Sequence, residues 1–165
     1  MNRLEGKIRD VAKQHPDKVA IDGDEFKLDY RTFLAEIDTL SSTMALDGSV
    51  LNKPHCHSFA ILMDNHPAWA IVDLAIQFQE HCCVPLPKFF SIEQIKHALV
   101  DAGVENIFLD ESESNDKVLA ALSESILSKD HLCIAGKRVY WVRLNQQIDL
   151  DKKEQKTPLS LKALI

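Results

Sequence analysis

Hydrophobic residues between positions 59 and 110 gather in short continuous runs that alternate with helix-length segments. Three runs, at 59–63, 82–86 and 107–109, have the length of a buried strand. Strands that alternate with helices are typical of a parallel sheet wound by crossover helices. We therefore expect an α/β fold of the Rossmann-like (flavodoxin-like) kind, in which these three strands lie parallel in one sheet.

The two helices between these strands differ in how their apolar residues are spread. The helix at 67–78 opens with Pro67, which suits a first helical turn, and its apolar residues cover most of its circumference. We expect it to be packed on two sides, of which the sheet supplies only one. The helix after Ser91 has a capping box with Gln94 and one apolar stripe before Gly103. It should lie on the sheet and face water.

The segment before residue 59 predicts a helix, a hairpin and a second helix. The first helix covers 4–14 and ends at Pro16, because the residue before a proline disfavours helical geometry. An N-terminal β-hairpin follows, with strands at 19–21 and 26–30 around Asp22-Gly23-Asp24. The next helix is amphipathic and ends near Gly48; its inward residues are Phe33, Ile37, Leu40 and Met44.

Beyond Asp110 the pattern weakens. A polar loop at 111–116 leads into a helix whose inward residues are expected to be Val118, Leu119, Leu122 and Ile126. Strands are predicted at 131–135 and 139–144, with the turn at Gly136-Lys137. Residues 145–157 are charged and without periodicity, and the closing LSLKALI is apolar again. We expect one partial α/β domain at 1–144 and a linker or truncated continuation at 145–165.

Composition narrows the class of protein. The chain has 165 residues, a formal net charge of −6 and a pI near 5.6, which disfavours nucleic acid as a partner, since that affinity comes from Lys and Arg. No apolar run approaches the roughly 18 residues that span a bilayer, and the N-terminus lacks the apolar core of a signal peptide. We expect a cytoplasmic protein without a transmembrane segment. Its four cysteines lack CxxC spacing, which favours reduced, buried thiols over disulfides.

Three segments in fixed order carry a resemblance to a known superfamily. They are HPDKVAIDGDEFKLDYRTF, FAILMDNHPAW and VPLPKFFSIEQIKHALVDAGVENIFLD. Together they resemble the N-terminal portion of the adenylate-forming (AMP-binding) enzymes, which include acyl-CoA synthetases, firefly luciferase and the adenylation domains of peptide synthetases. The chain departs from the family pattern at 54–57, where a Gly-Asp pair is usual, and at 81–82, where Gly-Ala is usual. The resemblance implies that the fold is part of the larger N-terminal domain of an acyl-CoA synthetase-like enzyme.

The resemblance implies ATP, Mg and CoA, or the phosphopantetheine of a carrier protein, for the full-length enzyme. In the family, the Ser/Thr/Gly-rich phosphate loop, the later adenylate-binding segments and the catalytic lysine all lie downstream of the matching segments. The residues agree, because none of the five glycines is close enough to another to form a phosphate-cradling loop. We expect no catalytic, cofactor-binding or metal-binding residue in this chain.

Four residues at strand ends are candidates to face a ligand. Asp64 and Asn65 follow the first strand, where doubly wound folds place ligands, although helix capping explains them equally well. Phe89 and Phe90 follow the second strand and either line an acyl pocket in the parent enzyme or pack under the loop.

Other residues of chemical interest have simpler explanations. His55, Cys56 and His57 are typical metal ligands, but neighbours on an extended chain point to opposite sides. Cys82 and Cys83 begin a predicted buried strand without an adjacent cation, which favours inert core thiols. His66 and His81 bracket one helix, and we interpret them as end residues rather than as an acid or base.

Three functions from different classes remain open. The first is the N-terminal portion of an ATP-dependent acid ligase, inactive alone, whose partners are the downstream remainder of the enzyme and its carboxylic acid substrate. The second is a receiver-like signalling domain with a phosphorylatable aspartate; such a site needs several carboxylates around magnesium, and Asp64 and Asp110 end different strands. The third is a stand-alone interaction module derived from the ligase fold. An exposed apolar helix at 67–78 would favour self-association. The acid itself is not specified.

Overall fold

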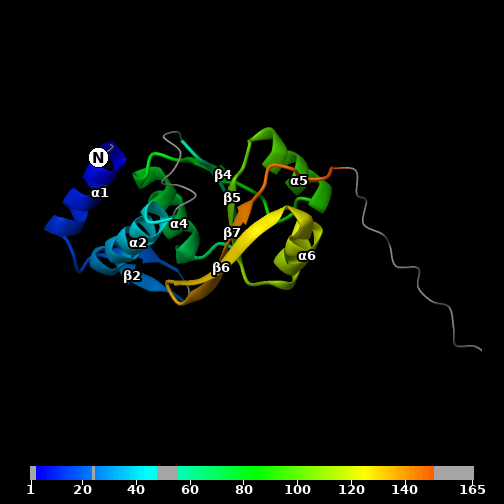
Figure 1. The fold of residues 1–165 in the computed structure, drawn as a ribbon. Coiled ribbons are helices and arrows are strands. Elements are labelled where there is room, and N and C mark those ends of the chain that lie inside the picture. The colour runs from blue at the N-terminus through cyan, green and yellow to red at the C-terminus, as the bar shows by residue number, and fades with distance from the viewer. Residues whose placement is uncertain (1–2, 24, 48–55, 151–165) are drawn as a thin grey trace, which may run out of the picture.

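The computed structural model describes residues 3–23, 25–47 and 56–150 (Figure 1). The helices are α1 (Arg3–Gln14), α2 (Tyr30–Ala45), α4 (Pro67–Phe78), α5 (Ile92–Asp101) and α6 (Glu113–Ala121), with a 3-10 turn η1 (Ser123–Ser125). The strands are β1 (Val19–Asp22), β2 (Lys27–Asp29), β3 (Ser58–Leu62), β4 (Cys82–Pro85), β5 (Asn106–Asp110), β6 (Ile126–Ile134) and β7 (Lys137–Leu144).

Five strands form the central sheet, in the order β4-β3-β5-β7-β6. β3 pairs in parallel with both β4 and β5, which confirms the orientation predicted for the three apolar runs. β7 then pairs antiparallel with β5, and β6 antiparallel with β7. The sheet is therefore mixed, because the C-terminal hairpin adds two antiparallel strands to the parallel core. The N-terminal hairpin of β1 and β2 forms a separate two-stranded sheet.

Helices cover both faces of this sheet (Figure 1). α2 and α4 lie on one face, where they share a core with side chains of β3, β5 and β7 that include Phe59, Phe108 and Trp141. α5 and α6 lie on the other face, over a second core that contains Leu62, Leu109 and further residues of the same strands. The two cores alternate along each strand because successive side chains point to opposite faces.

The expectation that α4 lacks a cover on its second side is wrong. Seven of its twelve residues are buried, among them Ile71, Val72 and Ile76, and the other five are half-buried. α2 supplies the missing layer with Phe33, Ile37, Leu40 and Met44, which share the core with α4. The prediction that α4 is packed on two sides is confirmed, and none of its residues is fully exposed. Self-association through this helix stays a prediction. The large exposed hydrophobic side chains of the described residues lie elsewhere, such as Leu46 and Phe89.

Two boundaries near the C-terminal hairpin also differ from prediction. The helix expected to extend to Ile126 ends at Ala121, and Ile126 instead starts β6, opposite Leu144. The turn lies at Ala135 and Gly136, one residue earlier than expected, because both have positive φ angles of 47° and 77°. A two-residue hairpin requires that conformation, since it matches the twist of the strands.

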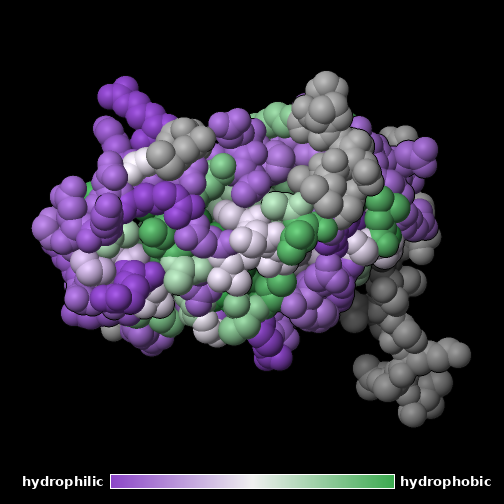
Figure 2. All heavy atoms as spheres, turned by 60° about the vertical axis from the view of Figure 1, so that its left-hand side comes forward, coloured by the Kyte–Doolittle hydropathy of each residue, from purple (hydrophilic) through white to green (hydrophobic). Residues whose placement is uncertain are grey.

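The outer layer is formed by α1, which packs on α2. Arg9 on α1 donates two hydrogen bonds to the carboxylate of Asp38 on α2, at 3.0 and 2.6 Å. Only Ala12 of α1 is buried. Seen from the side that carries α1 and α2, the surface is largely hydrophilic, with hydrophobic atoms in a band across its middle (Figure 2).

Candidate functional site

A buried carboxylate lies at the carboxyl end of β5. The side chain of Asp110 has no solvent-exposed surface, and each of its oxygens accepts hydrogen bonds from an ammonium and an amide. Oδ1 lies 3.1 Å from Lys88 Nζ and 2.6 Å from Asn115 Nδ2. Oδ2 lies 3.0 Å from Lys137 Nζ and 3.0 Å from the backbone nitrogen of Asp64. The lone pairs of this carboxylate are therefore well satisfied, as burial of a charge requires.

The partners of Asp110 come from four different segments. Asp64 follows β3, Lys88 lies between β4 and α5, Asn115 belongs to α6, and Lys137 is the first residue of β7. The carboxyl ends of parallel strands meet at one edge of a sheet, and β7 begins there because it runs antiparallel to β5. Sheet order thus brings these residues together although they are distant in sequence.

Two further contacts extend the cluster. Lys88 Nζ also lies 3.2 Å from Asp64 Oδ1 and 3.3 Å from the hydroxyl of Ser112, the residue that caps α6. The buried amide of Asn115 donates to the backbone oxygens of Leu62 at 3.1 Å and Asp110 at 2.8 Å. Asn115 therefore bridges the ends of β3 and β5, while Lys88 holds the loop after β4 against them.

Burial by itself would raise the pKa of Asp110. The hydrogen bonds from the Asp64 backbone and from Lys137 and Lys88 outweigh this effect, so the pKa of Asp110 lies below its ordinary value. The carboxylate is ionised at neutral pH. With Asp64, Lys88 and Lys137, the cluster contains two negative and two positive charges, so it is suited to fixing loops rather than to binding a highly charged ligand. Among the described residues, no group of three or more His, Cys, Asp or Glu side chains could hold a metal ion.

The two candidates after β3 have different surroundings. Asp64 contributes its backbone N–H to the cluster, but its side chain is 58% exposed. Asn65 lies in a groove of about 620 Å³ between the start of α4 and the N-terminal hairpin, beside Trp69 and Phe26. The residue that caps α4 is His66, so the capping explanation of Asp64 and Asn65 is wrong. A ligand-facing role for both stays a prediction.

The two phenylalanines after β4 are also placed differently. Phe89 is 86% exposed, whereas Phe90 packs against the core beneath α5 and α6. Their rings meet edge to face, with centroids 5.5 Å apart. Phe90 also lines a hollow of about 390 Å³ together with Lys88 and Asn115. Of the two alternatives for these rings, packing under the loop therefore fits Phe90. A ligand-facing role for either ring stays a prediction.

Sequence reasoning missed Lys88, Asn115 and Lys137 as members of the cluster. Lys88 had a usable signal, because a charged residue directly after the Pro-Leu-Pro strand end faces the edge where ligands bind. Asn115 and Lys137 had none, since polar residues in a loop or turn are usually solvated.

The cysteines and the other histidines lie outside this cluster. In the described residues the four thiols are free, as predicted, but Cys56, Cys82 and Cys133 are exposed rather than buried. Cys82 and Cys133 lie on β4 and β6, the two edge strands of the sheet, and Cys56 lies before β3. Burial raises the pKa of the Cys83 thiol, which makes it unreactive. The imidazole of His57 pairs with Glu105 at 2.5 Å. His55 lies outside the described residues, so the structure does not describe a metal site that would include it.

His66 couples the start of α4 to the cluster. Its Nδ1 accepts a hydrogen bond from the backbone nitrogen of Ala68 at 3.1 Å, and its ring meets Phe26 edge to face at 4.3 Å. Burial lowers the pKa of His66, and the charge of Lys137 lowers it further against the opposing charge of Asp110. The neutral imidazole is thus the form that caps the helix.

Acidification should therefore weaken the fold through His66. A group whose pKa is lower in the folded state contributes stability above its unfolded pKa, about 6.5, and loses it as the pH falls towards the folded value. His66→Asn keeps a good capping residue but does not titrate. We expect the free energy of unfolding of this variant, measured by urea denaturation from pH 7.5 to 5, to decline less than that of the parent chain. An equal decline would contradict the assignment.

The profile of the family described as AMP-binding enzyme matches residues 8–163. This chain belongs to the AMP-binding enzyme family. The match extends the resemblance of the three sequence segments over nearly the whole chain. Among proteins of curated function, none matches this AMP-binding chain by sequence.

Several solved structures have a similar fold. The N-terminal subdomain of NpsA from Klebsiella oxytoca, in complex with 3-hydroxybenzoyl-AMSN, matches with a TM-score of 0.58 and 20% identity over 68% of this chain and 28% of that chain. The artificially fused adenylation-PCP di-domain NRPS NpsA-ThdA from K. oxytoca matches with a TM-score of 0.59 and 21% identity, over 67% and 20%. The inhibitor-bound N-terminal domain of FACL13 from Mycobacterium tuberculosis gives 0.63 and 15%, over 74% and 30%.

At these low sequence identities, the structural similarity shows a shared fold. The AMP-binding chain spans between 20% and 30% of the length of these structures. In its described residues, no helix is long and apolar enough to cross a membrane.

Proposed function

We propose that this chain is the N-terminal portion of an ATP-dependent acid ligase. The complete enzyme would join a carboxylic acid to the α-phosphate of ATP, release pyrophosphate, and then pass the acyl group from the adenylate to a thiol. The thiol belongs to CoA or to the phosphopantetheine of a carrier protein. ATP and Mg would bind to the complete enzyme, and the chain's own partner would be the remainder of that enzyme.

The observation that carries this proposal is the family match across residues 8–163. The fold supports it, because N-terminal subdomains of adenylating proteins share the arrangement of this chain. The acyl-AMSN complexes of NpsA and its fusion to a PCP favour adenylate formation and a carrier-protein acceptor as the working hypothesis. The receiver-like alternative loses its basis, because Asp110, although close to Asp64, is buried and paired with two lysines.

The charged cluster would contribute to such an enzyme by fixing strand ends. Lys88 and Asn115 hold the loops that follow β4 and β5 against Asp110. In this chain no glycine is close to another in sequence, so no loop resembles a phosphate cradle. We therefore assign the cluster a positioning role and no catalytic one.

The isolated chain should neither bind ATP at micromolar concentration nor catalyse acid-dependent exchange of pyrophosphate into ATP. Isothermal calorimetry with Mg-ATP and an exchange assay over a panel of carboxylic acids measure these two properties. A complete adenylating enzyme, assayed in parallel, serves as the positive control. Micromolar affinity or exchange by the 165-residue chain would contradict the inactivity that we propose for it.

The ligase assignment itself has a separate test. The chain should be expressed together with the polypeptide encoded after Ile165, and exchange should then depend on one class of acid. Replacing the lysine of the Ser/Thr/Gly-rich loop in this extended polypeptide should abolish the exchange activity. If the extended polypeptide has no such loop and exchanges no pyrophosphate with any acid, the ligase proposal fails.

A further inference from the structure

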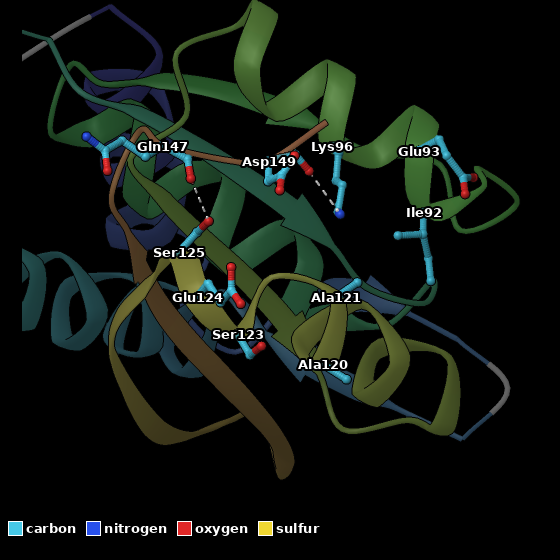
Figure 3. Close-up of a pocket in the computed structure, with 10 residues that line it drawn as sticks. All are labelled: Ile92, Glu93, Lys96, Ala120, Ala121, Ser123, Glu124, Ser125, Gln147 and Asp149. Atoms are coloured by element: carbon cyan, nitrogen blue, oxygen red, sulfur yellow. Dashed lines mark hydrogen bonds between the residues drawn. The ribbon is translucent and has the colours of Figure 1, made fainter. Parts of the chain in front are cut away.

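A cavity of about 190 Å³ lies between α5, the end of α6 and the segment 147–149 (Figure 3). It is separate from the charged cluster around Asp110, with which it shares no residue. Apolar atoms of Ile92, Ala120 and Ala121 form part of its wall, and the hydroxyl-bearing Ser123 and Ser125 form another part. The cavity therefore combines small apolar side chains with hydrogen-bonding groups.

The most unusual group of this cavity is Lys96. Its side chain is 95% buried, since only 5% of its surface is exposed, and Lys is almost never buried unless its charge is paired. Nζ donates one hydrogen bond, to the backbone oxygen of Asp149 at 3.1 Å. Within the part of the chain that the structure describes, Lys96 forms no ion pair with a carboxylate. An ammonium has three N–H donors, so this one can donate two further hydrogen bonds into the cavity.

Three residues with carboxylate side chains also line the cavity: Glu93, Glu124 and Asp149. Glu93 points away from Lys96 (Figure 3), although the charge of Lys96 contributes to lowering the pKa of Glu93. Glu124 and Asp149 each take part in an interaction as well. Lys96 is the cationic side chain among the residues that line this cavity.

We propose that this cavity binds a small organic carboxylate through Lys96. A carboxylate would accept hydrogen bonds from the two remaining N–H donors and form the direct ion pair that Lys96 lacks among the described residues. Its hydrocarbon part would contact Ile92, Ala120 and Ala121. An engineered apolar cavity of about 150 Å³ accommodates benzene, so the space here suits a carboxylate up to the size of benzoate. This inference rests on the cavity and Lys96 and does not depend on the proposed ligase function.

The test is a titration of the full 165-residue chain with sodium acetate, propionate and benzoate, followed by amide chemical shifts in NMR spectra. We expect saturable shifts at Lys96, Ser123 and Ser125. Lys96→Met keeps the approximate length of the side chain and its apolar stem, and removes the charge. Its affinity for the carboxylate should fall about tenfold to hundredfold.

Two further variants complete the design. Lys117→Met removes an exposed lysine of α6 and should leave the affinity unchanged. Ala121→Leu fills the cavity while Lys96 remains, and should abolish saturable binding. The proposal is overturned if no carboxylate gives saturable shifts, if Lys96→Met binds as well as the parent chain, or if inorganic phosphate binds at this site and the carboxylates do not.

Discussion

Replacing Asp110 with Asn should lower the free energy of unfolding by about 3–5 kcal/mol, because it removes one partner of a buried charge network. An amide of the same shape offers one acceptor and one donor group, whereas both oxygens of Asp110 accept from an ammonium and an amide. Whichever way the new side chain is turned, its NH2 group faces two donors. Lys88 and Lys137 also lose the charge that compensates them. Urea denaturation, followed by circular dichroism at neutral pH, measures the change.

Asp64→Asn is the matched control. Asp64 pairs with Lys88 at 3.2 Å, but its side chain is largely exposed, and exposed ion pairs contribute about 0–1 kcal/mol. The backbone N–H that Asp64 donates to Asp110 is unchanged by this substitution. If Asp110→Asn costs no more than Asp64→Asn, the cluster does not hold the strand ends together.

Asp110→Asn should also change how the stability of the chain responds to acid. The pKa of Asp110 is lowered by folding, so its contribution to stability is complete above the unfolded pKa of about 3.9 and is lost as the pH falls through the folded value. Asp110→Asn cannot show that loss. We expect the difference in stability between the parent chain and the variant to shrink below pH 4.

Replacing Arg143 with Met should cost about 2–4 kcal/mol, the second-largest effect that we expect. The guanidinium is largely buried and pairs with Asp47, which follows α2, and with Asp130 on β6 at 2.6 Å. It also lies over the ring of Trp141, with Cζ 4.1 Å from the centroid. Burial would lower the pKa of Arg143, but the two carboxylates raise it above its ordinary value. Removing the cation leaves Asp47 without this partner and uncovers the indole.

Arg138→Met tests whether the loss at Arg143 is specific. Arg138 lies on the same strand and pairs with Glu111, but its side chain is 79% exposed. Its replacement should change stability by about 0–1 kcal/mol. Tryptophan fluorescence should shift in Arg143→Met, because Trp141 gains contact with water, and should stay constant in Arg138→Met. If both variants lose the same stability and neither shifts the fluorescence, the buried ion pairs of Arg143 contribute no more than the exposed ion pair of Arg138.

The sequence by itself determined the features that depend on neighbouring residues. The apolar runs at 59–63, 82–86 and 107–109 became β3, β4 and β5, because a buried parallel strand requires little more than a short hydrophobic segment between helices. Ser91 and Gln94 form the predicted capping box at the start of α5. The segments that resemble the adenylate-forming enzymes pointed to the family. In each case the signal lies within a few residues of the structure that it specifies.

Only the tertiary structure decided which distant residues meet. Asp110 could be recognised as a strand end, but its pairing with Lys88 and Lys137 follows from sheet order and from the antiparallel direction of β7. The cover of α4 by α2 and the burial of Lys96 depend in the same way on the packing of whole elements. Local patterns specify a strand or a helix through backbone preference and burial, whereas the pairing of charges depends on the three-dimensional arrangement in which those elements exclude water together.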